Sequence, residues 1–194
     1  MAALPPAPDA ALPPRTLPWV GLPRRGGERL LLEEGTTVTA RDGTTVLLAY
    51  RNHKHAVDGS TLGIYGFVLG KGADKLEFEV RTEEEIYAEG VFAGRLWAVA
   101  GDYGRTEVLL MGPAPAAAMT EEAAADLART EAAAQGLVTE GSSSRGSDNG
   151  TIELHVRPDR TPPWRAVVGL WTGEVVSLRV LPPPPPPRPP RPRG

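Results

Sequence analysis

The chain has 194 residues, of which 41% are hydrophobic and 23% charged, and it contains no cysteine. This composition is typical of a globular protein long enough to bury one ordinary core, and the missing cysteines exclude disulfides, thiolate nucleophiles and cysteine-based metal sites. The net charge of −3 combines +2 over residues 1–27 and +3 over residues 182–194, which leaves −8 for the residues between. Because an acidic body repels the phosphate backbone, we expect no nucleic-acid partner for it.

Residues 1–27 hold 7 of the 21 prolines and are predicted to form a disordered N-terminal arm. They lack the basic and apolar regions of a signal peptide, and no apolar run in the chain approaches the length that spans a bilayer. We therefore expect a soluble protein inside a cell, in the cytoplasm or in a host-cell interior. Trp19, in LPWVGLP, is an isolated apolar residue that we interpret as an anchor for docking onto its own domain or a partner.

Residues 28–181 are predicted to form one all-β domain, an antiparallel β-sandwich or jelly-roll of about nine strands. Runs rich in Val, Leu, Thr, Tyr and Phe recur there between Gly, Asp and Asn breaks. They cover residues 28–34, 36–40, 44–51, 61–69, 75–82, 95–100, 106–111, 151–157 and 164–181, the last broken at Thr172-Gly173. The Asp42-Gly43 turn predicts a hairpin, and the alternation in LEFEV and TIELHV predicts strands with one buried face.

Residues 112–150 interrupt this pattern and are predicted to be an insertion between two strands. Thr120 can cap a helix whose first turn holds Glu121 and Glu122, and Gly136 can end it. Leu127 is its only large interior apolar side chain, so we expect the helix to pack weakly. The stretch EGSSSRGSDNG after it is expected to be flexible.

His53 and His55 are the metal candidates, with Asp58 three residues further on. At H-x-H spacing both imidazoles lie on one face of an extended segment. The pair resembles the first motif of the cupins, which implies a metal-binding enzyme with a β-barrel fold. However, the glycine expected six residues before the pair is Leu47. A polar loop is the commoner meaning of such a segment, so we predict no metal and no other cofactor.

Glu89 is the single candidate for a catalytic base, close to the acidic run at residues 83–85. An exposed acidic edge is the commoner meaning of such a run. Neither the G-x-S-x-G nucleophile motif nor the G-x-x-x-x-G-K-[ST] phosphate loop occurs in the chain. The sequence therefore favours a binding protein over an enzyme.

The order of features over residues 44–104 resembles the jelly-roll core of the trimeric dUTPases and of dUTPase-derived proteins of large DNA viruses. DGSTLGIYGFVLGKG stands where that family has the strand running into its phosphate motif, and AEGVFAGRLWAVAGDYG where it has its GVIDxDYRG hairpin. The resemblance implies that Glu89 replaces the aspartate that activates water, and Phe92 the tyrosine that packs on deoxyribose. Because GFVLGKG lacks the motif's serines and arginine, the resemblance implies such a fold without catalysis. A degenerate nucleotide pyrophosphatase is the alternative.

Residues 182–194 form a tail with 9 prolines and three arginines, PPPPPPRPPRPRG. It can adopt polyproline II and has the P-x-x-P spacing, with nearby arginines, that SH3-type grooves accept. The candidate partner-binding residues on it are Pro182, Pro185, Arg188 and Arg191. A solvated spacer is the commoner meaning of such tracts. With Trp19, the tail leads us to expect a non-enzymatic protein-interaction or regulatory protein. A homo-oligomer, as a structural subunit of a virion or other assembly, is the remaining alternative.

Overall fold

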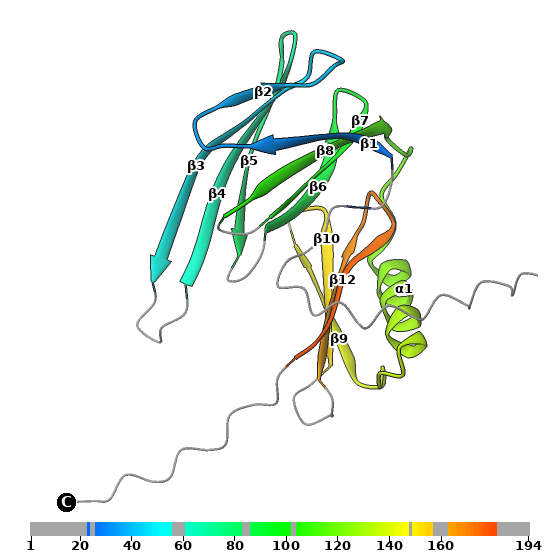
Figure 1. The fold of residues 1–194 in the computed structure, drawn as a ribbon. Coiled ribbons are helices and arrows are strands. Elements are labelled where there is room, and N and C mark those ends of the chain that lie inside the picture. Colours follow the sequence, from blue (N-terminus) through cyan, green and yellow to red (C-terminus); the bar gives the residue numbers. More distant parts are fainter. Residues whose placement is uncertain are drawn as a thin grey trace, which may run out of the picture.

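A computed structural model describes residue 23 and residues 26–55, 61–82, 86–101, 104–147, 149–156 and 163–181. Over these residues the chain forms twelve strands and one helix, arranged as three antiparallel four-stranded sheets (Figure 1). The predicted all-β class is confirmed. No helix in the described ranges is both long and apolar enough to cross a bilayer. Trp19, Asp58, residues 83–85 and residues 182–194 lie outside the described residues.

The outer sheet is an antiparallel meander with the order β2-β3-β4-β5. Its strands are β2 (Thr37–Thr39), β3 (Thr45–His55), β4 (Thr61–Lys71) and β5 (Asp74–Thr82). The expected hairpin around Asp42-Gly43 joins β2 to β3, since Thr39 pairs with Thr45. Leu76, Phe78 and Val80 of β5 all contribute to one core, as their alternation predicts.

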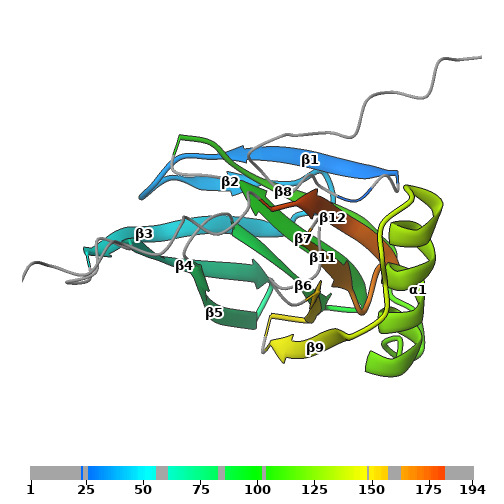
Figure 2. The same ribbon diagram turned by 90° about the horizontal axis from the view of Figure 1, so that it is seen from below.

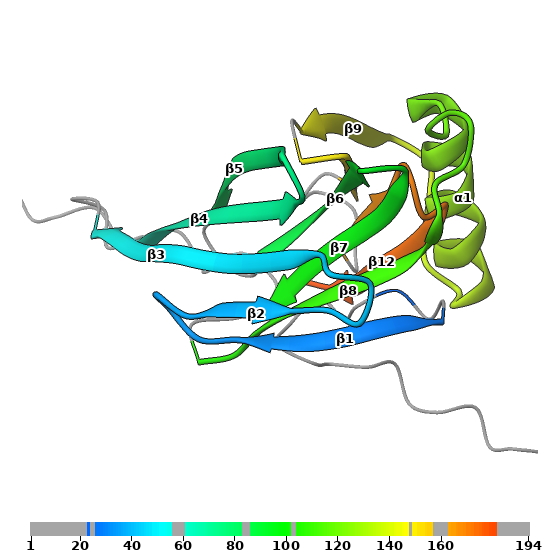
Figure 3. The same cartoon turned by 90° about the horizontal axis from the view of Figure 1, so that it is seen from above.

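The central sheet has the order β1-β8-β7-β6 and packs face to face on the outer sheet (Figures 1 and 3). Its strands are β1 (Gly27–Leu32), β6 (Ile86–Phe92), β7 (Arg95–Gly101) and β8 (Thr106–Pro113). The core between the two sheets includes Val46, Leu48, Tyr65, Phe67, Leu69, Trp97, Val99, Val108 and Leu110. The chain closes one side of this sandwich after β1, where Gly35 N–H donates to Leu48 O at 2.9 Å.

The C-terminal sheet has the order β12-β11-β10-β9 and forms a third layer. Its strands are β9 (Ser142–Ser147), β10 (Thr151–Val156), β11 (Trp164–Gly169) and β12 (Glu174–Val180), so the predicted break at Thr172-Gly173 is confirmed. One face covers the central sheet through Val167, Trp171 and Val176 (Figure 2). The other face carries α1 (Glu121–Ala134), packed on Ile152, Leu154, Val156, Trp164, Ala166 and Val168.

Residues 112–150, the predicted insertion, contribute α1 and β9 to this third layer. Thr120 caps α1 as expected, accepting a hydrogen bond from Ala123 N–H at 3.2 Å. The expectation of weak packing is wrong, because Ala124, Ala125, Ala128 and Ala132 are all buried. Small side chains let a helix approach a sheet closely, so a helix without large apolar residues can still bury a face. The stretch expected to be flexible contains β9, which is held by pairing with β10.

The strand predictions missed β6, which forms an edge of the central sheet. Its sequence IYAEGVF places a glutamate and a glycine in the middle of the strand, and both residue types are depleted in strands. The tertiary contacts explain this exception. The ring of Trp97 lies where a Cβ on Gly90 would sit, and the Glu89 carboxylate is held by the neighbouring sheet.

Candidate functional site

Glu89 lies between the central and the C-terminal sheets. Its side chain is directed away from the sandwich core, and the residue is only 3% exposed. Oε2 accepts a hydrogen bond from the Tyr87 hydroxyl at 2.6 Å. Oε1 accepts the backbone N–H groups of Trp171 at 2.5 Å and Thr172 at 2.9 Å, in the turn that joins β11 to β12. Three donors from two sheets therefore converge on one carboxylate.

Burial dominates the electrostatics of this cluster. It raises the pKa of Glu89, while the hydrogen bonds from Tyr87 and Thr172 act in the opposite direction. Burial, together with the charge of Glu89, raises the pKa of Tyr87 well above its ordinary value, which keeps its hydroxyl protonated as a donor. Gly169 leaves room for this packing, because a Cβ there would meet the Glu89 carboxylate.

The chemistry available to Glu89 follows from these contacts. The resemblance to dUTPases, which remains a prediction, would give Glu89 the activation of water and Phe92 the packing on a sugar. In the fold Glu89 joins two sheets, and Phe92 is a partly buried side chain packed against the sandwich core. The hydrogen bonds of the Glu89 carboxylate to the backbone N–H groups of Trp171 and Thr172 hold the turn after β11 against the central sheet.

The two histidines lie near the end of β3, on the hairpin that β3 makes with β4. His53 meets the ring of Tyr65 edge-on, with 6.1 Å between ring centres. His55 Nδ1 lies 2.9 Å from the Thr61 hydroxyl oxygen. Among the described residues no group of three or more His, Cys, Asp or Glu side chains could hold a metal ion.

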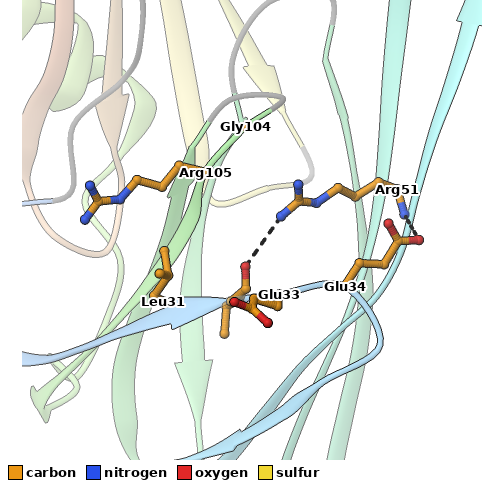
Figure 4. A pocket seen from close by; sticks show the side chains of 7 residues that line it. Leu31, Glu33, Glu34, Arg51, Gly104 and Arg105 are labelled. Atoms are coloured by element: carbon orange, nitrogen blue, oxygen red, sulfur yellow. Dashed lines mark hydrogen bonds between the residues drawn. The ribbon is translucent and has the colours of Figure 1, made fainter.

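A pocket of about 490 Å³ lies where β1 ends (Figure 4). It is lined by Leu31, Leu32, Glu33, Glu34, Arg51, Gly104 and Arg105. The guanidinium of Arg51 donates to Leu32 O at 3.4 Å, and Glu34 Oε1 accepts the Arg51 backbone N–H at 3.1 Å. Arg105 pairs with Glu107 at 2.5 Å. Charges of both signs around an exposed leucine are typical of the rim of a protein interface.

Sequence reasoning missed this pocket, because the residues that line it come from separate parts of the chain.

Comparison of the chain with protein-family models, with curated proteins and with solved structures finds no match.

A second group of exposed side chains lies at the end of the C-terminal sheet where β11 begins and β12 ends. Val180 is 51% exposed and Val138 is 42% exposed. Val180 pairs directly with Trp164 across β12 and β11, and the Trp164 indole N–H donates to Val138 O at 2.7 Å. The two valines therefore flank one buried tryptophan, and we call them the valine patch. Only scattered valines signal it in the sequence.

A charged cluster that the sequence did not indicate joins three turns of the sandwich. Asp42 Oδ2 lies 2.8 Å from Lys71 Nζ and 2.5 Å from an Arg95 guanidinium nitrogen. The hydrogen bond from Lys71 and those from Thr44 and Arg95 hold the pKa of Asp42 well below its usual range, against the effect of desolvation. Arg95 also donates to Met111 O at 2.8 Å. This arrangement joins the two sheets.

Proposed function

We propose that this chain is a non-catalytic protein-interaction domain that presents its C-terminal tail, residues 182–194, next to the valine patch. The observation that carries the proposal is the position of the patch. Val180 is the last residue of β12, and the tail begins two residues later. The backbone N–H of Leu181 donates to Pro163 O at 2.8 Å, which fixes the last described residue before the tail.

The partner class follows from the chemistry of the tail. A polyproline II segment rises about 3.1 Å per residue, binds in aromatic-lined grooves and is already extended, so little entropy is lost on binding. Arg188 and Arg191 add charges that pair with acidic residues beside such a groove. An SH3-type domain has both features. An apolar patch beside the tail adds contact area that a tail alone lacks, and this favours a docking role over a spacer.

The experiment is a titration of the full-length chain with purified SH3 domains, followed by calorimetry. One variant changes the tail (Pro182→Ala, Pro185→Ala, Arg188→Ala, Arg191→Ala), and another changes the patch (Val138→Asp, Val180→Asp). Arg41→Ala is the control for the tail variant, because Arg41 is an exposed arginine of the sandwich. We expect the tail variant to bind at least tenfold more weakly, the patch variant several-fold more weakly, and Arg41→Ala unchanged.

Two results would contradict the proposal. One is a tail variant that binds as tightly as the unaltered chain. The other is an absence of saturable binding across a panel of SH3 domains at millimolar concentration. A patch variant with unaltered affinity would separate the tail from the valine patch and refute their joint role.

A further inference from the structure

Strand β1 is an edge of the central sheet whose outer face is left uncovered. Its side chains alternate, with Leu30 and Leu32 in or against the sandwich core and Arg29 and Leu31 exposed. Leu31 is 52% exposed, the highest value among the described large apolar residues. The cluster beneath the C-terminal sheet draws its central-sheet residues from β6, β7 and β8 and includes none from β1.

The hydrogen-bonding edge of β1 is also available. In the central sheet β1 pairs with β8 on one side and has no strand on the other. Glu28 accepts the Arg41 backbone N–H at 3.0 Å and Leu32 O accepts from Arg51, but within the described part of the chain no strand pairs with the free side of β1. An exposed strand edge is a ready template for another strand, above all where an apolar side chain lies beside it.

The charges along this face are complementary to their own two-fold copy. Glu33 continues the alternation, so Arg29, Leu31 and Glu33 follow one another at spacings of two residues on one side of the strand. Within the described residues, neither Arg29 nor Glu33 forms a side-chain hydrogen bond or ion pair. When a second copy of the strand runs in the opposite direction, its anion faces the cation of the first copy and its cation faces the anion. The two aliphatic side chains then face each other between these pairs.

We propose that two copies of this chain pair antiparallel along β1, with Leu31 opposite Leu31 on the two-fold axis. In that register Arg29 of each copy lies opposite Glu33 of the other, so both ion pairs form at once. Directly opposite side chains in an antiparallel pair are neighbours on one face. The two central sheets then become one continuous sheet, as an isologous dimer requires.

Other registers are less favourable. A shift that centres the axis on Leu30 places Arg29 opposite Leu31 and leaves both charges without a partner. A shift that centres it on Arg29 places the two arginines opposite each other. A register shifted by an odd number of residues would align the outward side chains of one copy with the core-facing side chains of the other, which would expose apolar core residues. Charge complementarity therefore selects one register.

The pocket at the end of β1 is continuous with this edge. Leu31 and Glu33 line it, and Figure 4 shows Leu31 on the same side as Arg105 and apart from Arg51. A partner strand along β1 would pass over Leu31 and cover the pocket's open side. This dimer does not depend on the proposed binding of the tail, because the tail follows β12 in the sequence and β1 is the first strand.

Sedimentation equilibrium of the full-length chain from 5 to 500 µM, at low and high salt, tests the proposal. We expect a reversible monomer–dimer equilibrium that weakens with salt. Leu31→Asp, Arg29→Glu and Glu33→Arg should each raise the dissociation constant at least tenfold, because every substitution acts twice across the two-fold axis. The combined Arg29→Glu, Glu33→Arg chain should return to within about threefold of the unaltered chain, since the exchange restores both pairs.

The controls use exposed residues elsewhere. Arg145→Glu on β9 and Lys75→Glu on β5 each reverse an exposed charge, and neither should change the dimer. Thermal melts should show that all variants remain folded, because the altered side chains are exposed. A monomer at 500 µM overturns the proposal, and so does a dimer that persists in Leu31→Asp. If the combined Arg29→Glu, Glu33→Arg chain has a dissociation constant as high as those of the single substitutions, the proposed register is overturned.

Discussion

Replacement of Glu89 by alanine tests whether this carboxylate joins the central and C-terminal sheets. The change removes the acceptor of three buried donors, the Tyr87 hydroxyl and the backbone N–H groups of Trp171 and Thr172. Leaving a buried donor unsatisfied costs about 1–3 kcal/mol each, partly offset because a buried charge disappears. We expect Glu89→Ala to lower the free energy of unfolding by about 3 kcal/mol.

The pH dependence of the unfolding free energy separates the contribution of the Glu89 charge from that of its hydrogen bonds. Burial raises the pKa of Glu89, so the folded chain holds this proton more tightly than the unfolded chain does. The stabilisation linked to protonation is complete below the unfolded pKa of about 4.3 and is lost as the pH rises through the folded pKa. Glu89→Gln has no such proton, and its oxygen can still accept both backbone N–H groups. The difference in stability between Glu89→Gln and the unaltered chain should therefore shift in favour of glutamine with rising pH.

Urea unfolding followed by circular dichroism, repeated between pH 4 and pH 8, gives both quantities. Glu153→Gln is the matched control, because Glu153 forms a partly exposed ion pair with Arg165 at 2.7 Å and should contribute less than about 1 kcal/mol. If the unfolding free energy of Glu89→Ala lies within about 1 kcal/mol of that of the unaltered protein, the reasoning is refuted. A pH dependence identical in the unaltered chain and Glu89→Gln would refute the electrostatic part.

Gly169 supplies a coupled test of the same packing. A methyl group on Gly169 would meet the Glu89 carboxylate and the Thr172 hydroxyl, and overpacking of this kind costs about 1–3 kcal/mol. Part of that penalty should disappear in the Glu89→Ala background, where the carboxylate is gone and only the Thr172 hydroxyl still meets the methyl group. A double-mutant cycle measures the coupling, and strictly additive effects would show that the two residues do not press on each other.

Two further predictions concern the turns of the sandwich. Ala93 has a φ of 48° next to Gly94 at 74°, a left-handed conformation that costs an L-residue about 1–2 kcal/mol, so Ala93→Gly should raise the unfolding free energy by about 1 kcal/mol. Ala133→Gly, on the exposed side of α1, should lower it by a similar amount and serves as the control in the same urea titrations. Asp42→Asn should destabilise the chain by about 1 kcal/mol at neutral pH, because it weakens the pairing with Lys71 and Arg95. Folding lowers the pKa of Asp42, so below the ordinary carboxyl pKa the unfolded chain takes up this proton before the folded chain does, and the loss caused by Asp42→Asn should shrink as the pH falls. A loss that stays constant down to pH 2 would contradict that assignment.

The local pattern of the chain was enough to predict most strands and the helix caps. Alternation placed Ile152, Leu154 and Val156 on one buried face, and these residues do form one core with α1. Thr120 and Gly136 marked the helix ends because capping depends on residues within one turn. The pattern failed at β6 and β9, where strand formation depends on partners distant in sequence. Glu89, for example, is tolerated in β6 only because donors some 80 residues away satisfy it.

The candidate sites likewise divide into those made of residues adjacent in the sequence and those made of distant residues. The histidine pair and the proline-rich tail could be found from sequence because their residues are adjacent. The pocket at the end of β1 and the valine patch could not. Arg51, Arg105 and Leu31 line one pocket only after folding, and only then do Val138 and Val180 both neighbour Trp164. Their spacing in the chain follows no period that a sequence pattern can reveal.

By itself, then, the sequence determined that this protein is mainly antiparallel β-structure with one capped helix, because strand and helix periodicity are properties of short segments. Only the tertiary structure decided how these segments are layered: a central sheet covered on one face by the outer sheet and, except at β1, on the other by the C-terminal sheet, and a helix that packs through alanines. It also decided which edge and which side chains stay exposed. Burial is a property of the whole arrangement, since a side chain is covered only when distant segments come to lie on it.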